Sequence, residues 1–463
     1  MFLGWLKQLP HSNLSSTMTR PKQVTIAGSG LVGALQSIYL AKRGFDVTLF
    51  ERRPDMRANR MSAGRSINLA LSDRGFKGLE GVGIRKEIEE ISIAMYRRVM
   101  HDTKGNLSFQ NYGKDGQAIY SVSRGGLNCK LMDLAEESGV KIKFSERCTN
   151  VNLETGTAVF ENPEGKHTVE SEFLIGADGA YSEVRNEMEK RPWFNYSQYY
   201  IDYAYKELSI PPAADGSHQL EKNALHIWPR KDFMLIALPN LDGSFTLTLF
   251  FPKTGPLSFD SLDTIDKAEA FFRDQFPDAL DLMPHFRQEY AENPAAAMVI
   301  VRCYPWSWGD KIMLIGDAAH AIVPFYGQGM NCGFEDCSVF NELLDNHEGN
   351  WASLMRKYEQ SRKRNGDAIA ELALRNFIEM RDRVSQPEFL LQKKIEGWFS
   401  EKHPTLWTPL YSMVTFSHMP YADALEKGDR QEYIMQKVMK LPNIEERWNS
   451  DEVEQIILSG LNV

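Results

Sequence analysis

Three glycines near the start of the chain have the spacing of a phosphate-binding loop. Gly28, Gly30 and Gly33 form a GxGxxG pattern within "VTIAGSGLVGAL", and Glu51 follows in "TLFERR". The first two glycines allow a tight turn with the backbone close to a pyrophosphate, and the third lets a helix pack closely on a strand. Free N–H groups near Val32 would face the phosphates, and Glu51 could accept hydrogen bonds from a ribose diol. The pattern predicts a bound dinucleotide but does not distinguish NAD from FAD.

A second loop of this kind lies near the other end of the chain, in "LIGDAAHAIVPFYGQGMN". Asp317 follows a buried strand there and could accept hydrogen bonds from ribityl hydroxyls. The N–H groups of Met330 and Asn331, at a helix start, could face a flavin ring and stabilise negative charge on its reduced form. A third segment, "GADGAYSEVR", places Asp178 after another buried strand. NAD needs no such distant motifs, whereas FAD is longer, so we expect the loops to hold opposite ends of one FAD.

The hydrophobic patterns place these loops on two kinds of sheet. Residues 23–28 read as a buried strand, 31–44 as a helix and 46–51 as a second strand, which implies a right-handed crossover in a parallel sheet. "GVKIKFSERCTNV" and "TVESEFLIGADG" are typical of further strands. Residues 203–251 are rich in β-formers, and "NLDGS" between two apolar runs fits a hairpin, so a second, antiparallel sheet is expected.

These patterns predict an α/β fold, with a Rossmann-like FAD-binding domain, an inserted antiparallel β-sheet domain for the substrate, and a helical C-terminal region. The helical pattern begins at residue 331, with breaks at Pro387, Pro404 and Pro420. The expected boundaries are 22–75, 105–185 and 300–345 for the discontinuous FAD-binding domain, 76–104 and 186–299 for the substrate domain, and 346–463 for the helical region. Residues 1–20 read as a disordered leader, and either Met1 or Met18 could be the start.

Composition excludes several classes of protein. A formal net charge of -9 argues against a nucleic-acid partner, which would need a basic face. Five cysteines, with no CxxC pair, are typical of a reducing cytoplasm. The histidines show no HxH or HExxH spacing, so no metal site is expected. No apolar run approaches the roughly 20 residues needed to cross a bilayer, so no membrane span is expected.

Together, the three motifs resemble those of the single-component FAD-dependent aromatic hydroxylases. More narrowly, the blocks "GRSINLALSDRG", "LHIWPR", "IALPN", "VPFYGQGMN" and "LYSMVTFS" resemble the members of that family that hydroxylate L-kynurenine. The resemblance runs from about Lys22 to about Tyr421, and we find little to match after it. Eukaryotic members carry a membrane-anchoring tail there, whereas this chain resembles the soluble bacterial members. A cytoplasmic monomer or homodimer is therefore expected.

The resemblance implies that NADPH reduces the FAD, that O2 is captured as a flavin hydroperoxide, and that one oxygen is transferred to the ring to give 3-hydroxykynurenine. The flavin carries this chemistry, so no side chain is assigned as catalytic. His320 could be a general base, but the ring amino group of kynurenine already donates electrons to the neighbouring carbon. Two alternatives remain open: a related hydroxylase acting on another aromatic amino or carboxylic acid, and a flavin protein that transfers electrons without hydroxylation.

The resemblance also implies which residues contact the substrate. Arg98 in "MYRRVMHD" matches an arginine that pairs with the substrate carboxylate, although its neighbour Arg97 is an alternative. A guanidinium suits this task because it binds a carboxylate through two parallel hydrogen bonds. The remaining implied contacts are two tyrosines on the same carboxylate, a polar contact from the helical region, and two residues beside the flavin and the aromatic ring: Tyr112, Tyr411, Asn376, Pro324 and Phe325.

For FAD, the resemblance adds four side chains and one backbone contact to the motif residues. The side chains are those of Arg52, Arg53, Ala70 in "SINLALS" and Arg124 in "SVSRGG". Cys148, at the end of the third strand, is expected to contribute only backbone near the adenine. The resemblance does not fix Arg57 and Arg60, which read either as a solvated loop or as a site for the NADPH phosphate.

Overall fold

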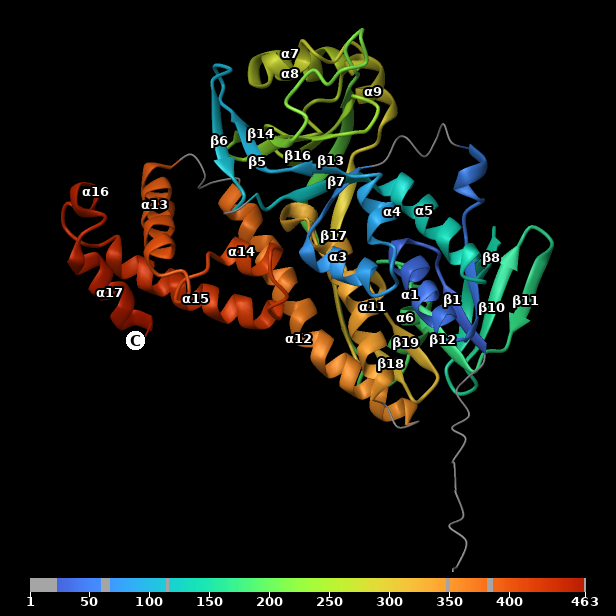
Figure 1. The fold of residues 1–463 in the computed structure, drawn as a ribbon. Helices are drawn as coiled ribbons and strands as arrows, with labels where there is room; N and C mark the ends of the chain where they lie inside the picture. The colour runs from blue at the N-terminus through green and yellow to red at the C-terminus, as the bar shows by residue number, and fades with distance from the viewer. Residues whose placement is uncertain (1–22, 60–66, 114–115, 347–349, 381–385, 462–463) are drawn as a thin grey trace, which may run out of the picture.

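The glycine-rich loop follows the carboxyl end of an interior strand of a six-stranded, mainly parallel sheet (Figure 1). The structure, a computed structural model, describes residues 23–59, 67–113, 116–346, 350–380 and 386–461, so the expected leader lies outside the described residues. The strand order is β18-β19-β12-β1-β2-β8, and only the edge strand β18 runs antiparallel. The strands are β1 (Gln23–Ala27), β2 (Asp46–Glu51), β8 (Lys141–Phe144), β12 (Phe173–Gly176), β18 (Ser307–Trp308) and β19 (Ile312–Leu314).

Helices pack around this sheet and share one hydrophobic core with it. The central strands β12 and β19 are wholly buried, which explains their nearly continuous apolar sequences. The β1–helix–β2 unit expected from the sequence is confirmed by the parallel pairing of β1 with β2. The helices of this core include α1 (Leu31–Lys42), α3 (Asp73–Glu80), α4 (Arg85–Glu89), α5 (Arg124–Glu137), α6 (Glu183–Glu189) and α11 (Gly329–Asp345), together with parts of two later helices.

A second sheet of seven strands has the order β17-β13-β16-β15-β14-β5-β6 and is antiparallel except where β14 meets β5. Its strands are β5 (Arg97–His101), β6 (Leu107–Asn111), β13 (Asn195–Ile210), β14 (Ala224–Arg230), β15 (Phe233–Pro239), β16 (Phe245–Pro252) and β17 (Ala296–Tyr304). The hairpin expected at "NLDGS" is confirmed by the pairing of β15 with β16.

The two faces of the seven-stranded sheet have different neighbours, and alternate residues of each strand serve them. Phe233 and Leu235 share a core with α7 (Ile265–Gln275), α8 (Pro277–Leu280) and α9 (Phe286–Glu292), which lie over one face (Figure 1). Met234 and Ile236 share a different core with the C-terminal helices. The sheet therefore separates a structural layer from the layer that contains the predicted site.

Two three-stranded sheets complete the β structure. One pairs β7 (Ile119–Ser123) with β3 (Asn68–Leu71) and β4 (Ile93–Met95), and the other joins β9 (Arg147–Asn152), β10 (Thr157–Asn162) and β11 (Gly165–Val169). Cys148 was expected at the end of the third strand, and this is wrong. The strand β8 ends at Phe144, and Cys148 lies in β9, because Ser145 turns the chain with a φ of 58°.

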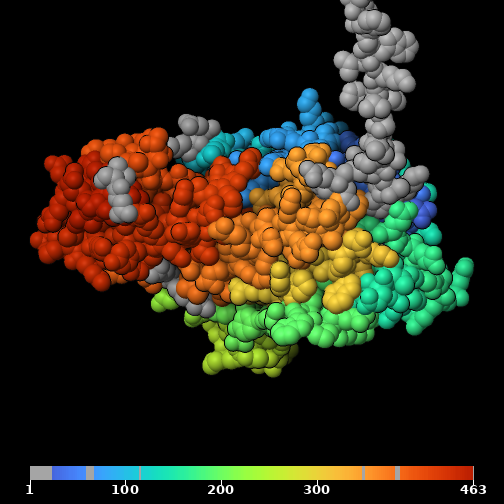
Figure 2. All heavy atoms as spheres, turned by 90° about the horizontal axis from the view of Figure 1, so that it is seen from below, coloured from blue at the N-terminus to red at the C-terminus, as the bar shows by residue number. Residues whose placement is uncertain are grey.

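The C-terminal region is helical, as expected. Figure 2 shows its last helices gathered at one end of the molecule, beyond α12. Pro387 begins α13, and Pro420 immediately precedes α15, so prolines mark helix starts. Within the described residues, we find no helix with both the length and the apolar character needed for a bilayer span. The helices are α12 (Trp351–Ile378), α13 (Pro387–Lys402), α14 (Leu410–Thr415), α15 (Tyr421–Val438), α16 (Ile444–Arg447) and α17 (Asp451–Leu461).

Two of the expected domain segments belong in part to the other sheet or to its core. β6 pairs with β5 in the seven-stranded sheet, although 105–185 was assigned to the FAD-binding domain. α3 and α4 bury Phe76, Leu79 and Ile88 in the core of the parallel sheet, although 76–104 was assigned to the substrate domain. Both differences arise from long-range packing that local patterns do not report. The other domain boundaries remain a prediction.

We expect Gly33→Ala to destabilise the fold, because a Cβ at this position would lie 2.0 Å from the Gly28 carbonyl oxygen. Overpacking of this kind costs about 1–3 kcal/mol. The measurement is the melting temperature without added ligand. Gly30→Ala is the matched control, since Gly30 has a φ of -69° and a Cβ there would meet nothing within 4 Å. Equal melting temperatures for the two variants would contradict the packing argument.

Candidate cofactor and substrate site

The two motif loops at opposite ends of the chain meet in the structure. A Cβ placed at Gly316 would lie 3.0 Å from Val32, and one placed at Gly333 would lie 2.5 Å from it. Gly28, with a φ of 102°, lies against the loop after β12, where an added Cβ would be 2.5 Å from the Ala177 carbonyl oxygen. All three predicted loops therefore surround one space.

The carboxylate of Glu51 is fixed at the end of β2, and the residue is only 6% exposed. One oxygen accepts a hydrogen bond from the Ser29 N–H at 3.1 Å. The other accepts from the backbone and side chain of Arg53 at 3.0 and 2.9 Å. Arg52 and Arg53 are themselves exposed. Among the described residues, the buried hydroxyl of Ser29 has no hydrogen-bond partner, so the loop offers a free polar group.

Asp178 has a structural role that the sequence did not indicate. Its Oδ2 accepts hydrogen bonds from the first two N–H groups of α6, those of Glu183 at 2.7 Å and Val184 at 3.4 Å. Its Oδ1 is buried and has no partner in the described part of the chain. Burial raises the pKa of Asp178, and hydrogen bonds from Ser182 and Glu183 oppose this. The pKa of the nearby Cys148 thiol is raised to about 12, mainly because the thiol is buried and also because the negative charge of Asp178 is close. This thiol is therefore neutral.

Asp317 begins α10 (Asp317–His320) and is solvent-accessible, although both of its neighbours are buried. Desolvation of the Asp317 carboxyl by the protein around it raises its pKa, and the charge of Arg124 lowers it. The carboxylate is thus surrounded by protein atoms but still accessible to solvent. Arg124, the exposed first residue of α5, lies close enough to interact with it.

The side chain of Asn331 ties three backbone segments together. Its Oδ1 accepts from the Ser72 N–H at 2.9 Å, and its Nδ2 donates to the carbonyls of Ala70 at 2.9 Å and Gly327 at 2.7 Å. Because the amide is fully used, Asn331 and the buried Met330 have their backbone N–H groups to offer a cofactor. The sequence analysis also expected the backbone N–H groups of these two residues to face the flavin ring.

A cationic and aromatic cluster lies next to these loops. Arg98 of β5 has its guanidinium carbon 4.5 Å from the ring centre of Tyr411 and 5.1 Å from that of Tyr112. In the described residues, neither the buried Nε of Arg98 nor the hydroxyl of Tyr112 has a hydrogen-bond partner. Burial raises the pKa of Tyr112, which therefore stays a neutral hydroxyl. A buried Arg98 Nε and a buried Tyr112 hydroxyl without partners are the kind of groups that an anion site would offer, since buried polar groups are normally paired.

Arg97 lies away from this cluster, because successive residues of a strand point to opposite faces. Its Nε and Nη2 both donate to Glu221, each at 2.8 Å. The side chain of Arg97 is 40% exposed. Both of these hydrogen bonds go to Glu221 and neither goes to a tyrosine. The structure thus separates the two arginines that the sequence left as alternatives.

Tyr411 lies between two other tyrosines. Its ring stacks on Tyr112 at 5.7 Å and on Tyr326 at 5.6 Å, with interplanar angles of 16° and 12°. Sequence reasoning gave Tyr326 no role. No signal in the chain indicates it, because the stack is formed by α14, the segment after β6 and the 3-10 turn η2 (Pro324–Tyr326).

The same turn joins the cluster to the cofactor loops. Phe325 stacks on Phe377 at 4.0 Å, and Nδ2 of Asn376 donates to the Phe325 carbonyl at 2.7 Å. A Cβ placed at Gly327 would be 3.3 Å from Ala70, which packs with Tyr112 and Tyr411. Pro324 is exposed beside Phe325. Asn376 thus holds the turn in place, whereas the sequence assigned its side chain to the substrate.

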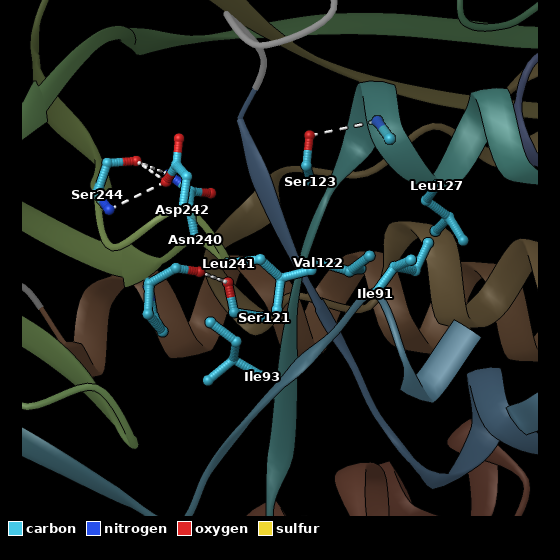
Figure 3. Close-up of a pocket in the computed structure, with 12 residues that line it drawn as sticks. Ile91, Ile93, Ser121, Val122, Ser123, Leu127, Asn240, Leu241, Asp242 and Ser244 are labelled. Atoms are coloured by element: carbon cyan, nitrogen blue, oxygen red, sulfur yellow. Dashed lines mark hydrogen bonds between the residues drawn. The ribbon is translucent and has the colours of Figure 1, made fainter. Parts of the chain in front are cut away.

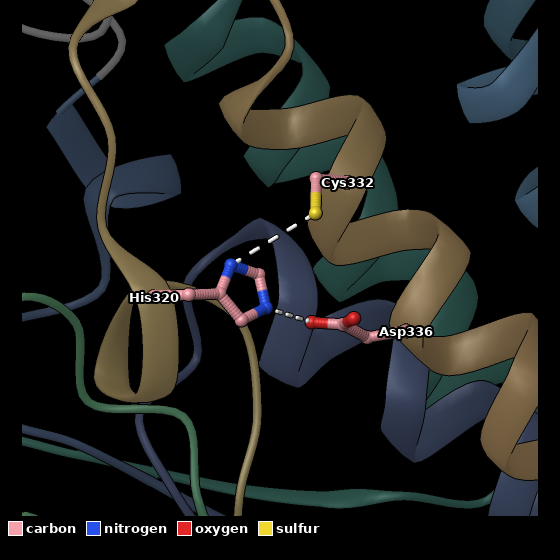
Figure 4. Close-up of side chains that lie close together, drawn as sticks. All are labelled: His320, Cys332 and Asp336. Atoms are coloured by element: carbon pink, nitrogen blue, oxygen red, sulfur yellow. Dashed lines mark hydrogen bonds and ion pairs between the residues drawn. The ribbon is translucent and has the colours of Figure 1, made fainter. Parts of the chain in front are cut away.

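A buried group of His320, Cys332 and Asp336 resembles a metal site in composition but is already paired (Figure 4). His320 Nε2 lies 2.6 Å from Asp336 Oδ2, and Arg362 Nε donates to Oδ1 at 2.6 Å. Burial opposes protonation of His320, but the Asp336 carboxylate outweighs it and raises its pKa. Two cationic partners therefore occupy the carboxylate that a metal ion would need.

A cavity of about 330 Å³ lies elsewhere, between β7, the start of α5 and the turn after β15 (Figure 3). Its apolar floor includes Ile93 and Leu127. The carboxylate on its rim, Asp242, accepts hydrogen bonds from the backbone and hydroxyl of Ser244. None of the residues assigned from the sequence line this cavity. The polar atoms without partners that mark the candidate site are not among its lining, so we place the chemistry at the loops and the tyrosine cluster.

Arg57, the described member of the pair left open for NADPH, is engaged within the protein. It contacts Asp55, Asp133 and Glu136 at 2.8, 2.8 and 2.5 Å. These three carboxylates leave it no free charge for a phosphate. Arg60 lies outside the described residues.

Comparison with known proteins agrees with this geometry. The family described as FAD binding domain matches residues 22–373. The tetrameric form of 2-methyl-3-hydroxypyridine-5-carboxylic acid oxygenase has the same fold, with a TM-score of 0.66 and 19% identity over 80% of this chain and 95% of that chain. PqsL of P. aeruginosa gives a TM-score of 0.62 with 17% identity, over 78% and 97% of the two chains. The fold and the loops define a flavoprotein of the aromatic hydroxylase class that binds FAD.

Curated relatives show which family within this class the chain belongs to. A kynurenine 3-monooxygenase of Christiangramia forsetii is 51% identical over 444 residues, which cover 96% of this chain and 99% of the relative. One of Flavobacterium psychrophilum is 49% identical over 96% of this chain and all of the relative, and one of Dictyostelium discoideum is 44% identical over 90% and 93%. The chain belongs to the kynurenine 3-monooxygenase family. The match also extends beyond the stretch from Lys22 to Tyr421, so the expectation that similarity stops at Tyr421 was wrong.

The residues of the loops fit FAD. Ser29 and Asp178 provide polar atoms without partners, Glu51 provides a fixed carboxylate, and the space beside Gly30 is open to a phosphate. Asp317 adds an exposed carboxylate at the start of α10. These are the groups that a ribose, a pyrophosphate and a ribityl chain require.

We expect Glu51→Gln to weaken FAD binding, because it removes the charge that assists hydrogen bonds from a ribose diol. Loss of a charge-assisted bond costs about 1.5–3 kcal/mol, which raises the dissociation constant of FAD roughly 10- to 150-fold. Fluorescence of released flavin during dilution measures this constant. Asp46→Asn is the control, since Asp46 lies at the other end of β2 in an exposed pair with Lys141. A Glu51→Gln protein that retains flavin like wild type would remove Glu51 from the site.

Proposed function

We propose that the protein hydroxylates L-kynurenine to 3-hydroxykynurenine, with FAD bound and with NADPH and O2 as co-substrates. In this reaction one oxygen atom enters the ring, the other leaves as water, and NADPH is oxidised to NADP+. The observation that supports it best is the anion site of Arg98 and Tyr112, whose free polar atoms lie beside the turn that borders the flavin loops. The names of the relatives support the substrate.

Arg98 would bind the carboxylate of the substrate's amino-acid group. The guanidinium is charged at every relevant pH, and its free Nε gives it a donor for a carboxylate oxygen. The hydroxyl of Tyr112 would donate a second hydrogen bond, because its raised pKa keeps the proton on it. Tyr411, 4.5 Å from the guanidinium carbon, would close the carboxylate site from the side of the C-terminal region.

Aromatic residues would hold the substrate ring and exclude water. Phe325 is 6% exposed and Tyr326 is 8% exposed, so the turn next to the cofactor loops presents a dry apolar surface. When bound, FAD supplies the transfer of electrons from NADPH and the activation of O2. The chain's contribution is to orient the substrate ring and keep competing water away.

The site has no need of a strong protein base. The amino group on the kynurenine ring donates electrons to the neighbouring carbon, which favours attack on an electrophilic oxygen. His320 is 5% exposed and bound to Asp336, so it is already engaged within the protein. This arrangement supports a structural role for His320 in place of a catalytic one.

We also propose that the protein acts in the cytoplasm, as a monomer or homodimer. The described residues include all five cysteines and contain no disulfide, which fits a reducing compartment. Light scattering of the FAD-loaded protein would distinguish the two oligomeric states.

The strongest test of the proposed function is Arg98→Ala. Truncating one member of a buried, hydrogen-bonded charge pair costs about 2–5 kcal/mol, so kcat/KM for kynurenine should fall roughly 30-fold to several thousand-fold. Arg98→Lys should restore only part of this, because a point charge cannot form two parallel bonds. Kynurenine-stimulated NADPH oxidation and product mass are the measurements, and FAD content should stay near that of wild type.

Arg97→Ala is the internal control for this test. Its exposed pair with Glu221 should contribute about 0–1 kcal/mol at most, so activity should change little. If Arg97→Ala abolishes the stimulation while Arg98→Ala keeps it, the assignment of the carboxylate site is wrong. If neither change matters, the substrate is another aromatic amino or carboxylic acid.

A further inference from the structure

Arg74 is a fully buried arginine that the sequence analysis did not assign. It lies at the second position of α3, just after β3, and its side chain is 0% exposed. Its guanidinium lies 4.0 Å from the ring centre of Tyr421. Within the described residues, the hydrogen bonds of its guanidinium go to the helix α11 or to the C-terminal region: Glu335 Oε1 at 2.6 Å, Val414 O at 2.9 Å, Met413 O at 3.4 Å, and Met419 O.

Three of these acceptors are carbonyls at or just after the end of α14. This helix has six residues, and a helix so short has too few internal hydrogen bonds to be stable alone. The last carbonyls of any helix lack partners within it. Arg74 supplies a partner for that of Val414 and a second, longer contact for that of Met413, which also accepts from Ser417 Oγ at 2.6 Å, and its positive charge lies at the negative end of the helix. The position of α14 is therefore set from outside, by a residue of another domain layer.

The same helix carries Tyr411. This residue stacks between Tyr112 and Tyr326 and lies against Arg98. Tyr421, under the guanidinium of Arg74, donates a hydrogen bond to Gln328 Oε1 at 2.9 Å, in the loop that precedes α11. One buried side chain thus links the segment after β3, the cofactor loop and the helix that supplies a tyrosine to the carboxylate site.

We propose that Arg74 is a positioning residue for the substrate pocket: it docks α14 on the flavin-binding core and so holds Tyr411 over Arg98. The inference rests on the proposed function of this site and names a residue that acts through Tyr411. Arg74 itself contacts the protein and not the substrate.

The chemistry of the contacts requires arginine at this position. Three carbonyls and one carboxylate lie around a single planar group, which matches the fixed fork of a guanidinium. Glu335 remains available as the anionic partner: burial would raise its pKa, but Arg362 and Arg74 outweigh this and lower it. A lysine would keep the charge but could not reach all four acceptors. Arg74→Lys should therefore loosen α14 without leaving Glu335 uncompensated.

The test uses the FAD-loaded protein and kynurenine-stimulated NADPH oxidation. We expect Arg74→Lys to raise the KM for kynurenine about 5-fold or more, as loss of one or two hydrogen bonds would, with FAD affinity unchanged. Hydrogen exchange of the amides in residues 410–416 should become faster, while exchange in α1 should stay the same. Arg74→Gln, which also removes the charge, should have a larger effect of the same kind.

A double-mutant cycle separates positioning from a general structural role. Tyr411→Phe should raise the KM in the wild-type background, and it should add little in the Arg74→Lys background, because the hydroxyl is already displaced there. Additive effects of the two changes would overturn the proposal. Arg364→Lys is the matched control: Arg364 also contacts the C-terminal region, through Asp423, but it is 62% exposed. It should leave the KM unchanged.

The remaining outcomes also decide the matter. If both Arg74 variants fail to fold or to bind FAD, Arg74 is a general folding determinant and the proposal is wrong. An unchanged KM in a folded Arg74→Lys protein would likewise overturn it. A wild-type protein that shows no kynurenine-stimulated oxidation would instead contradict the proposed function, and slower exchange in residues 410–416 of wild type than of Arg74→Lys would then still support the anchoring of α14.

Discussion

The contact between Val32 and the two glycines Gly316 and Gly333 is the constraint on which the cofactor site depends. A side chain at either glycine would meet Val32 at 3.0 Å or less. The first helix and the late helix α11 can therefore approach closely, and Cys337 Sγ lies 3.6 Å from the Val32 carbonyl along the same line. Because this approach joins loops from opposite ends of the chain, the cleft for one long cofactor forms between them. The other FAD residues are arranged around that approach.

A buried chain of charges extends the constraint to the C-terminal region. Arg362 of α12 contacts Glu335 and Asp336, both at 2.6 Å, and Glu335 also pairs with Arg74. Taking these groups out of water is costly, so the network is weak evidence for stability, but removing one partner would leave a buried charge uncompensated. What the network does define is geometry. It joins α3, α10, α11 and α12 through specific pairs of side chains.

The sequence was most informative where local chemistry fixes the structure. The glycine spacing, the buried strand of residues 23–27 and the acid at Glu51 predicted one crossover unit, and the structure contains it. The hairpin at "NLDGS" and the helices after residue 331 were predicted for the same reason, since turn residues and prolines act locally.

The sequence was least informative where partners are distant. The positive φ of Ser145 splits a strand that its apolar pattern would continue, which moved Cys148 into another sheet. Asp178 caps α6, and the Asn376 amide binds a backbone carbonyl, and neither role has a local signature. Arg74 stood in a quoted block without a role, because its four acceptors are at least 261 residues away. The assigned contacts to FAD and kynurenine remain predictions.

The tyrosine stack has a consequence for the order in which the enzyme becomes complete. Its three members come from the segment after β6, from η2 and from α14, so they leave the ribosome in the order Tyr112, Tyr326, Tyr411. Every loop assigned to FAD precedes Tyr411 in the chain. A growing polypeptide therefore possesses its cofactor loops before its carboxylate site can close, so synthesis completes the loops assigned to the cofactor before the tyrosine stack.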